Sequence, residues 1–195
     1  DEIVILHIRA VGSWTGNLLN YYKDLRNESN PGEKVNLPVL IDGPYGTPSD
    51  KVFNAEIAIL VATGIGVTPY SSILKSLLHR IYVNKEPNLP KKIYFYWQNR
   101  GQNSFEWFVD LLSKIEEKDI DKRIDLNIFL TGTQSQKDMK SSMLFIAMDM
   151  KHKKTNVDLI TGLKVKTNFG RPNWKDIFTD ISKVHPNEKT EIFFC

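Results

Sequence analysis

The sequence predicts an α/β protein built on a doubly wound parallel sheet, and two features predict it. Residues 55–62, AEIAILVA, form a continuous apolar run, which is typical of a parallel strand that is buried on both faces. From this run to the end of the chain, strand-like and helix-like patterns alternate. Such alternation is typical of a parallel sheet with helices on both faces and with ligands at the carboxyl ends of its strands.

The elements after residue 55 follow from the spacing of the apolar residues. A helix is predicted from Pro69 to about Tyr82, because apolar residues recur along one helical stripe: Ile73, Leu74, Leu77, Leu78 and Ile81. Further strands are expected at 91–97, 124–130 and 191–195, and further helices at 104–118, around 138–151 and at 174–184. Residues 161–173 have a loop-like composition.

The first part of the chain has a different rhythm. Strands are expected at 2–10, with one apolar face, and at 35–41. A short helix is expected after the segment GSWT (12–15), because four apolar residues follow at helical spacing: Leu18, Leu19, Tyr22 and Leu25. Residues 42–50, DGPYGTPSD, are rich in proline and glycine and form the candidate boundary. We therefore expect two domains, 1–46 and 47–195.

Composition excludes several classes of function. The chain is 41% hydrophobic and 25% charged, as in ordinary globular proteins, and its net charge of +3 is too small to indicate a nucleic-acid partner. No apolar run reaches the length of a membrane span. The four histidines have no ligand-like spacing, so no metal site is expected, and a single cysteine excludes an internal disulfide.

The segment VATGIGVTPY (61–70) carries the main binding hypothesis. Gly64 and Gly66 follow the buried strand directly, and Pro69 opens the next helix. Missing side chains let a phosphate approach the backbone, and the free N–H groups of a helix start favour an anion. Proline suits the first helical turn because its missing N–H would be unpaired there. A GxGxxP turn of this kind predicts a phosphate cradle, to which the Thr68 hydroxyl adds a contact.

The end of the second predicted strand favours NADPH over NADH. An NAD site usually has an acidic residue here, but this strand runs into Gln98, Asn99 and Arg100. A guanidinium can grip a 2′-phosphate with two hydrogen bonds. Arg171 could add a second cation if the third and fourth strand ends converge. The alternative for Arg100 is a solvated arginine at a strand end. Ser104 and Glu106 are interpreted as a capping box rather than as catalytic groups.

Several segments, taken together, resemble the dehydrogenase domain of the NADPH oxidase family, within the ferredoxin–NADP reductase-like superfamily. They are LHIRAVGSWT, GPYGTP, GIGVTP, SFEWF, ITGL, GRPNW and the terminal FFC, in the family's order through nearly the whole chain. The resemblance implies a Rossmann-like NADPH-binding domain, preceded by part of the antiparallel β-barrel of an FAD-binding domain. It also implies a hydride transfer from NADPH to FAD, then single electrons passing through transmembrane haems to oxygen, which yields superoxide.

The resemblance assigns roles to individual residues. The NADPH pyrophosphate would face Gly64, Gly66, Thr68 and Pro69. The adenosine and its 2′-phosphate would lie among Trp97, Arg100 and Arg171, and the nicotinamide beside Cys195. The bend between the domains near flavin and nicotinamide would be Gly43, Pro44, Tyr45 and Gly46. The flavin diphosphate would be held by Thr15 with the backbone from Gly12 to Trp14, and by Arg9. The implied partners are the transmembrane haem domain of the same protein and a regulatory domain or subunit, at the cytosolic face of a membrane.

Two departures from the family pattern bear on activity. Ala62 stands where the family often has glycine, and the family's flavin-binding HPFT-type segment is absent. We therefore expect this piece to be soluble, to bind FAD poorly and to be inactive alone. Rival interpretations are a ferric reductase or a soluble flavoprotein reductase with another electron acceptor, and a non-catalytic nucleotide-binding module. Because the cofactors carry the chemistry of hydride transfer, no catalytic triad is required.

Overall fold

The computed structural model describes residues 6–43, 45, 48–101, 106–119, 121–132 and 139–195. The chain divides into two compact units, 1–47 and 48–195. The predicted boundary between domains lies at 46–47.

The first unit contains helix α1 (Ser13–Glu28), as the apolar spacing predicts. Gly12 is the N-cap, and the Thr15 hydroxyl accepts the backbone N–H of Gly12 at 3.0 Å and of Val11 at 3.1 Å. Residues 6–11 and 33–43 do not form strands in the described part of this unit. A strand needs a hydrogen-bonded neighbour, and these two segments do not pair with each other here. The half-barrel assigned to residues 1–46 stays a prediction.

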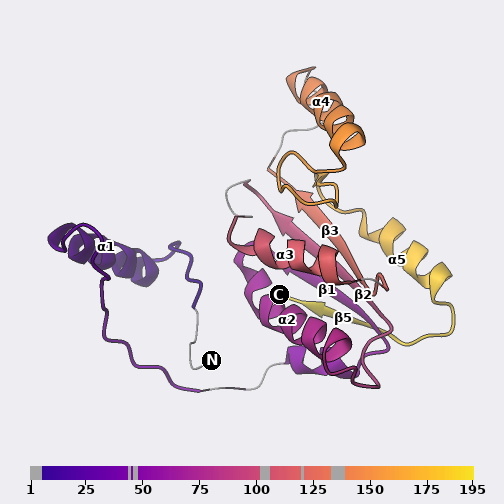
Figure 1. The fold of residues 1–195 in the computed structure, drawn as a ribbon, viewed down its shortest axis with the longest axis horizontal. Helices are drawn as coiled ribbons and strands as arrows, with labels where there is room; N and C mark the ends of the chain where they lie inside the picture. Colours follow the sequence, from indigo (N-terminus) through magenta and orange to yellow (C-terminus); the bar gives the residue numbers. More distant parts are fainter. Residues whose placement is uncertain (1–5, 44, 46–47, 102–105, 120, 133–138) are drawn as a thin grey trace. The chain divides into compact units, whose positions relative to one another are not determined.

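The second unit is a five-stranded parallel sheet in the order β4-β3-β2-β1-β5 (Figure 1). Its strands are β1 (Ile57–Thr63), β2 (Lys92–Asn99), β3 (Ile124–Leu130), β4 (Asn168–Phe169) and β5 (Thr190–Phe194). From β1 the chain proceeds outward through β2, β3 and β4, then returns to place β5 on the other side of β1. The strand order therefore reverses between β1 and β5, which is the usual ligand position in such sheets.

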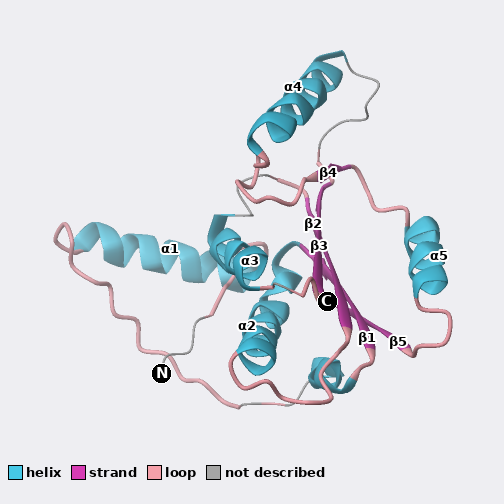
Figure 2. Ribbon diagram, turned by 45° about the vertical axis from the view of Figure 1, so that its right-hand side comes forward, coloured by secondary structure: helices cyan, strands magenta, loops and turns pink. Residues whose placement is uncertain are grey.

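Helices cover both faces of the sheet, so the predicted doubly wound α/β architecture is confirmed (Figure 2). The larger core lies under α2 (Thr68–Tyr82) and α3 (Glu106–Lys118), which lie side by side on one face. The smaller core packs the other face against α5 (Trp174–Val184) through Ile177 and Ile181. β1 alternates between the two cores, with Leu60 in one and Ile59 in the other, which explains its uninterrupted apolar run.

The remaining elements are the 3₁₀ helices η1 (Pro48–Asn54) and η2 (Gly64–Val67) and the helix α4 (Met139–Thr155). β3 and α5 have the predicted bounds, and the other long elements shift by a few residues at their ends. Within the stretch 161–173, which has a loop-like composition, the structure adds the two-residue strand β4. Among the described helices, none has the length and apolar character required to cross a membrane.

Candidate functional site

The carboxyl edge of the sheet brings the predicted nucleotide-binding residues into one row. All five strands are parallel, so their carboxyl ends share this edge. Following the strand order β4-β3-β2-β1-β5, the residues one or two positions after each strand include Arg171, Gly132, Arg100, Gly64 and Cys195. Neighbouring strands lie about 4.8 Å apart. Arg100 and Arg171 are therefore separated by about 10 Å at the backbone, which two arginine side chains can span.

The glycine turn after β1 has the form that the sequence predicts. Gly64 adopts φ 58°, which disfavours any residue with a side chain. The turn continues through η2 into α2, and Pro69 lies in the first turn of that helix. α2 extends over 15 residues and has no side-chain cap at its N-terminus. Thr68, its first residue, donates its N–H to Ile65 O, and Pro69 has no N–H. The N–H groups without an intrahelical partner are therefore those at the start of η2, in the glycine turn itself, where an anion can approach them.

Gly66 fits closely against the end of β5. A Cβ on Gly66 would lie 2.6 Å from the carbonyl carbon and oxygen of Cys195. The Cys195 backbone is fixed to β1, since its N–H donates to Val61 O and its oxygen accepts from Thr63 N, both at 3.0 Å. The Cys195 side chain is exposed and unoxidised. The turn and the cysteine thus form one corner at the point where the strand order reverses.

The Trp97 side chain lies in the core, packed against the glycine turn. Its side chain is fully buried and packs at right angles to Phe108, with ring centroids 5.2 Å apart. The indole N–H donates to the carbonyl of Gly64 at 3.1 Å. The predicted contact between Trp97 and the adenosine does not fit this structure, because the ring has no surface to offer.

Hydrogen bonds also join the ends of β2 and β3 at the carboxyl edge. Asn99 O accepts hydrogen bonds from the N–H of Thr131 at 2.7 Å and from its hydroxyl at 3.2 Å. Asn99 Oδ1 accepts the N–H of Arg100 at 3.0 Å. Any Cβ on Gly132 would collide with the backbone oxygen of Arg100. The backbone of Arg100 is thus held in place, while its side chain is exposed.

Two buried polar atoms near this edge have no hydrogen-bond partner among the residues that the structure describes: Asn99 Nδ2 and the Tyr70 hydroxyl. Tyr70 lies in the first turn of α2, is fully buried and meets Phe95 edge to face. Burial raises the pKa of Tyr70 to about 12, and the nearby Cys195 adds to this increase. An unpaired buried donor costs about 1–3 kcal/mol of stability. Burial leaves these atoms little surface for a ligand, so they mark a local cost in stability beside the carboxyl edge.

Arg171 owes its position to a buried carboxylate that sequence reasoning missed. Asp158 is 3% exposed and accepts hydrogen bonds from the N–H and hydroxyl groups of both Thr161 and Thr167, at 2.9–3.0 Å. Burial alone would raise the pKa of Asp158, but these hydrogen bonds lower it below its usual value. They fix the loop that leads to β4, which pairs with β3 just before Arg171. Nothing in the sequence distinguishes Asp158 from a surface aspartate.

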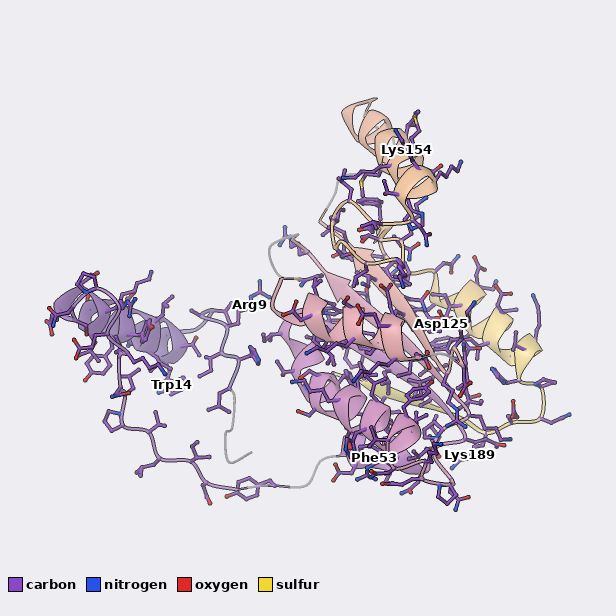
Figure 3. The ribbon with its side chains drawn as sticks, in the orientation of Figure 1. Arg9, Trp14, Phe53, Asp125, Lys154 and Lys189 are labelled. Atoms are coloured by element: carbon purple, nitrogen blue, oxygen red, sulfur yellow. The ribbon has the colours of Figure 1, made fainter. Side chains whose placement is uncertain are left out.

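The candidates in the first unit are mostly exposed. Arg9 and Trp14 lie on either side of the α1 start (Figure 3), and the Thr15 hydroxyl is already engaged by its own helix cap. Gly43 adopts φ 130°, and Tyr45 donates to Asp42 Oδ2 at 2.5 Å. Pro44, Gly46 and the Ser104 of the predicted capping box lie outside the described residues. No group of three potential metal ligands occurs in the part of the chain that the structure describes.

This arrangement defines a dinucleotide-binding class of domain. It has a helix start after a glycine turn, a reversal of strand order beside it, and cations further along the same edge. Comparison with known proteins identifies the family. The family model for the ferric reductase NAD binding domain matches residues 56–195, and the chain belongs to this family.

Curated relatives confirm the resemblance to NADPH oxidases. The chain is 38% identical over 200 residues to human NADPH oxidase 3, covering 100% of this chain and 34% of that protein. It is 31% identical over 226 residues to respiratory burst oxidase homolog protein B of Oryza sativa subsp. japonica, covering 100% of this chain and 25% of that protein. The chain thus spans about a quarter to a third of the length of these relatives. A solved ferredoxin-NADP+ reductase from Plasmodium falciparum aligns at 19% identity over 79% of this chain and 59% of that chain, with a TM-score of 0.35.

Proposed function

We propose that residues 48–195 bind NADPH along the carboxyl edge of the sheet and present its nicotinamide beside Cys195. The observation that carries this proposal is the order of residues along that edge. Cys195 lies at one end, the glycine turn next to it, and Arg100 and Arg171 further along. This order matches a dinucleotide, whose pyrophosphate lies between its nicotinamide and its adenosine 2′-phosphate.

The residues present fit this cofactor. The N–H groups of the glycine turn at the start of η2 and the Thr68 hydroxyl would hold the pyrophosphate, and Gly64 and Gly66 would let it approach. Arg100 and Arg171 would pair with the 2′-phosphate, because guanidinium groups bind phosphate with paired hydrogen bonds. Asn99 Nδ2 is an unused donor beside Arg100. When bound, NADPH supplies a hydride and FAD accepts it, while this chain holds the two groups in position.

The flavin half of the proposal rests on residues 1–46. The backbone around Gly12 to Trp14 would face the flavin diphosphate through the N–H groups of Ser13 and Trp14, because the Gly12 N–H donates to Thr15 Oγ1, and Arg9 would add a positive charge. The Thr15 hydroxyl caps the same turn and would orient it. The segment from Gly43 to Gly46 would form the bend between the two domains. We expect these residues alone to hold FAD weakly.

In the whole protein, this piece would be the dehydrogenase domain of an NADPH oxidase at the cytosolic face of a membrane. Electrons would continue through a transmembrane haem domain to oxygen, which yields superoxide, under a regulatory domain or subunit. The names of the oxidase relatives support this reading. The second candidate is a ferric reductase, which the family description favours. The two differ in the electron acceptor, which this chain does not contain.

The test is a fluorescence titration of the chain with NADPH and with NADH. Replacing Arg100 by alanine should weaken NADPH binding by about 1.5–3 kcal/mol and leave NADH nearly unchanged, because one charge-assisted contact to the 2′-phosphate is lost. Arg123→Ala, at the opposite edge of the sheet, is the matched control and should change neither affinity. An equal loss for both nucleotides would make Arg100 structural. No binding of either nucleotide would favour a non-catalytic module.

A further inference from the structure

A groove of about 480 Å³ lies between α2 and α3, and none of its lining residues belongs to the glycine turn. We call it the α2–α3 groove. Leu78 from α2 and Leu111 from α3 line it and are nearly buried, whereas Val83, just after α2, is 64% exposed. The groove therefore offers an apolar surface that the chain itself leaves accessible. The nucleotide proposal makes no use of it.

Four basic side chains line the groove: Lys75 and His79 from α2, and Lys114 and Lys118 from α3. In each pair the residues are four apart, so they lie on one helix face about 6 Å apart along the axis. Among the lining residues the single carboxylate is Asp110. The result is two parallel basic rows along the two sides of an apolar surface.

These four basic groups form no ion pair in the part of the chain that the structure describes. Some other surface lysines do form ion pairs. Lys153 and Lys166 both bind Asp149, at 2.8 and 2.6 Å, and Lys91 binds Glu56 at 2.5 Å. The α2–α3 groove is thus a surface where positive charge is left uncompensated. Uncompensated charge of one sign attracts a partner of the opposite sign.

The chemistry of the groove indicates which kind of anion fits. A single phosphate is best held by converging arginines or by the N-terminus of a helix. Here the cations are lysines and a histidine spread along two helices, and the middle and C-terminal parts of α2 line the groove. A phosphate would also leave the apolar residues uncovered. A membrane surface is a poor match as well, because it needs apolar side chains that protrude, whereas Leu78 and Leu111 are nearly buried.

We propose that the α2–α3 groove docks an acidic peptide segment of a partner protein, whose carboxylates pair with the two basic rows and whose apolar side chain covers Leu78, Leu111 and Val83. The segment is extended or helical and carries acidic residues on both sides of a leucine-like residue. This is an interaction surface separate from the nucleotide site, and it can be tested without nucleotide.

The experiment measures fluorescence anisotropy of a labelled synthetic peptide of glutamates around two leucines, titrated with the chain. The double variant Lys114→Glu/Lys118→Glu should weaken binding about tenfold or more, because attraction becomes repulsion. The matched control, Lys175→Glu/Lys183→Glu on α5, makes the same change in net charge and should change affinity by about twofold or less. Far-ultraviolet circular dichroism confirms that both variants are folded.

Two further peptides separate charge from apolar contact. Replacing the glutamates by glutamine, or the leucines by alanine, should each weaken binding to the unaltered chain. No binding of the acidic peptide, or an equal loss in the two double variants, would overturn the proposal. It would also be overturned if vesicles of phosphatidylcholine and phosphatidylserine bound the chain through Lys114 and Lys118 while the peptide did not.

Discussion

The two edges of the sheet differ in how many of their polar side chains are paired. At the amino edge, Lys91 pairs with Glu56 and Glu188, at 2.5 and 2.9 Å, and His185 lies between Glu188 and the Tyr94 hydroxyl. These partners raise the pKa of Lys91 and lower the pKa of both glutamates. Next to this network, the backbone N–H of Lys189 donates to Glu56, and η1 carries Phe53, whose ring lies under Arg80 (Figure 3).

The carboxyl edge contains two side-chain polar atoms and two arginines that lack such partners among the described residues. Asn99 Nδ2 and the Tyr70 hydroxyl have no partner, and neither Arg100 nor Arg171 forms an ion pair among the described residues. Unpaired groups reduce the stability of the free protein. Proteins commonly accept such local costs at functional sites. We infer that the paired groups at the amino edge stabilise the fold, and that the carboxyl edge is where a ligand would bind.

The largest expected effect concerns the close contact between Gly132 and the backbone of Arg100 at the carboxyl edge. Gly132→Ala should lower the free energy of unfolding by about 3 kcal/mol, because its Cβ would collide with the backbone oxygen of Arg100 and that backbone must shift. Gly101→Ala is the control, since a Cβ there meets nothing within 4 Å. Urea denaturation of both variants measures the difference. Equal stability of the two variants would show that the ends of β2 and β3 are not held as described.

The second prediction tests how much the fully hydrogen-bonded carboxylate of Asp158 contributes to stability. Asp158→Asn should lower the free energy of unfolding by about 2 kcal/mol at pH 7, because an amide cannot accept all the hydrogen bonds from Thr161 and Thr167. The folded pKa of Asp158 is lowered. Its contribution is therefore complete above the unfolded pKa of about 3.9 and is lost as pH falls through the folded value.

Denaturation midpoints measured from pH 7 down to acidic pH check this prediction. The gap between the unaltered chain and Asp158→Asn should close as the pH falls. Asp180→Asn, on the exposed face of α5, should show a much smaller gap at every pH. A gap for Asp158→Asn that widens toward low pH would contradict the assignment.

The smallest effect compares two tyrosine hydroxyls, one at each edge. Tyr82 donates to Asp119 at the amino edge, so Tyr82→Phe should cost about 1 kcal/mol of stability and leave NADPH affinity unchanged. The Tyr70 hydroxyl is unpaired, so Tyr70→Phe should leave stability unchanged or raise it by about 1 kcal/mol. Thermal denaturation of the two variants measures both. A clear loss of stability in Tyr70→Phe would show that this hydroxyl has a partner in the free protein.

The sequence predicts the sheet and the glycine turn well, because both follow from local patterns. The apolar run of β1 needs cover on both faces, and the turn with Pro69 marks the start of a helix. β4 has two residues, too few for any periodicity. Strands at 2–10 and 35–41 form only when they pair with neighbouring strands in a sheet. The local residue pattern does not show whether such neighbours are present.

The site residues were harder to predict where burial or close approach decides their role. In KKIYFYW, alternate aromatics face opposite cores, so nothing local shows that Trp97 is fully buried beneath Gly64. Gly132 matters only because Arg100 O lies next to it, and Asp158 only because Thr161 and Thr167 surround it. Each of these residues acquires its role from neighbours that are distant in sequence, or from a loop conformation that no sequence motif announces.

Backbone hydrogen exchange, followed by mass spectrometry with and without NADPH, tests the contrast between the edges most directly. Binding at the carboxyl edge should slow exchange in residues 64–68, 70, 99–101 and 170–171, because under the proposal their N–H groups would lie at or beside the nucleotide. Exchange at the amino edge, in residues 119–124 and 185–189, should not change. Slower exchange confined to the amino edge, or NADPH binding without any change in residues 64–70, would contradict the account.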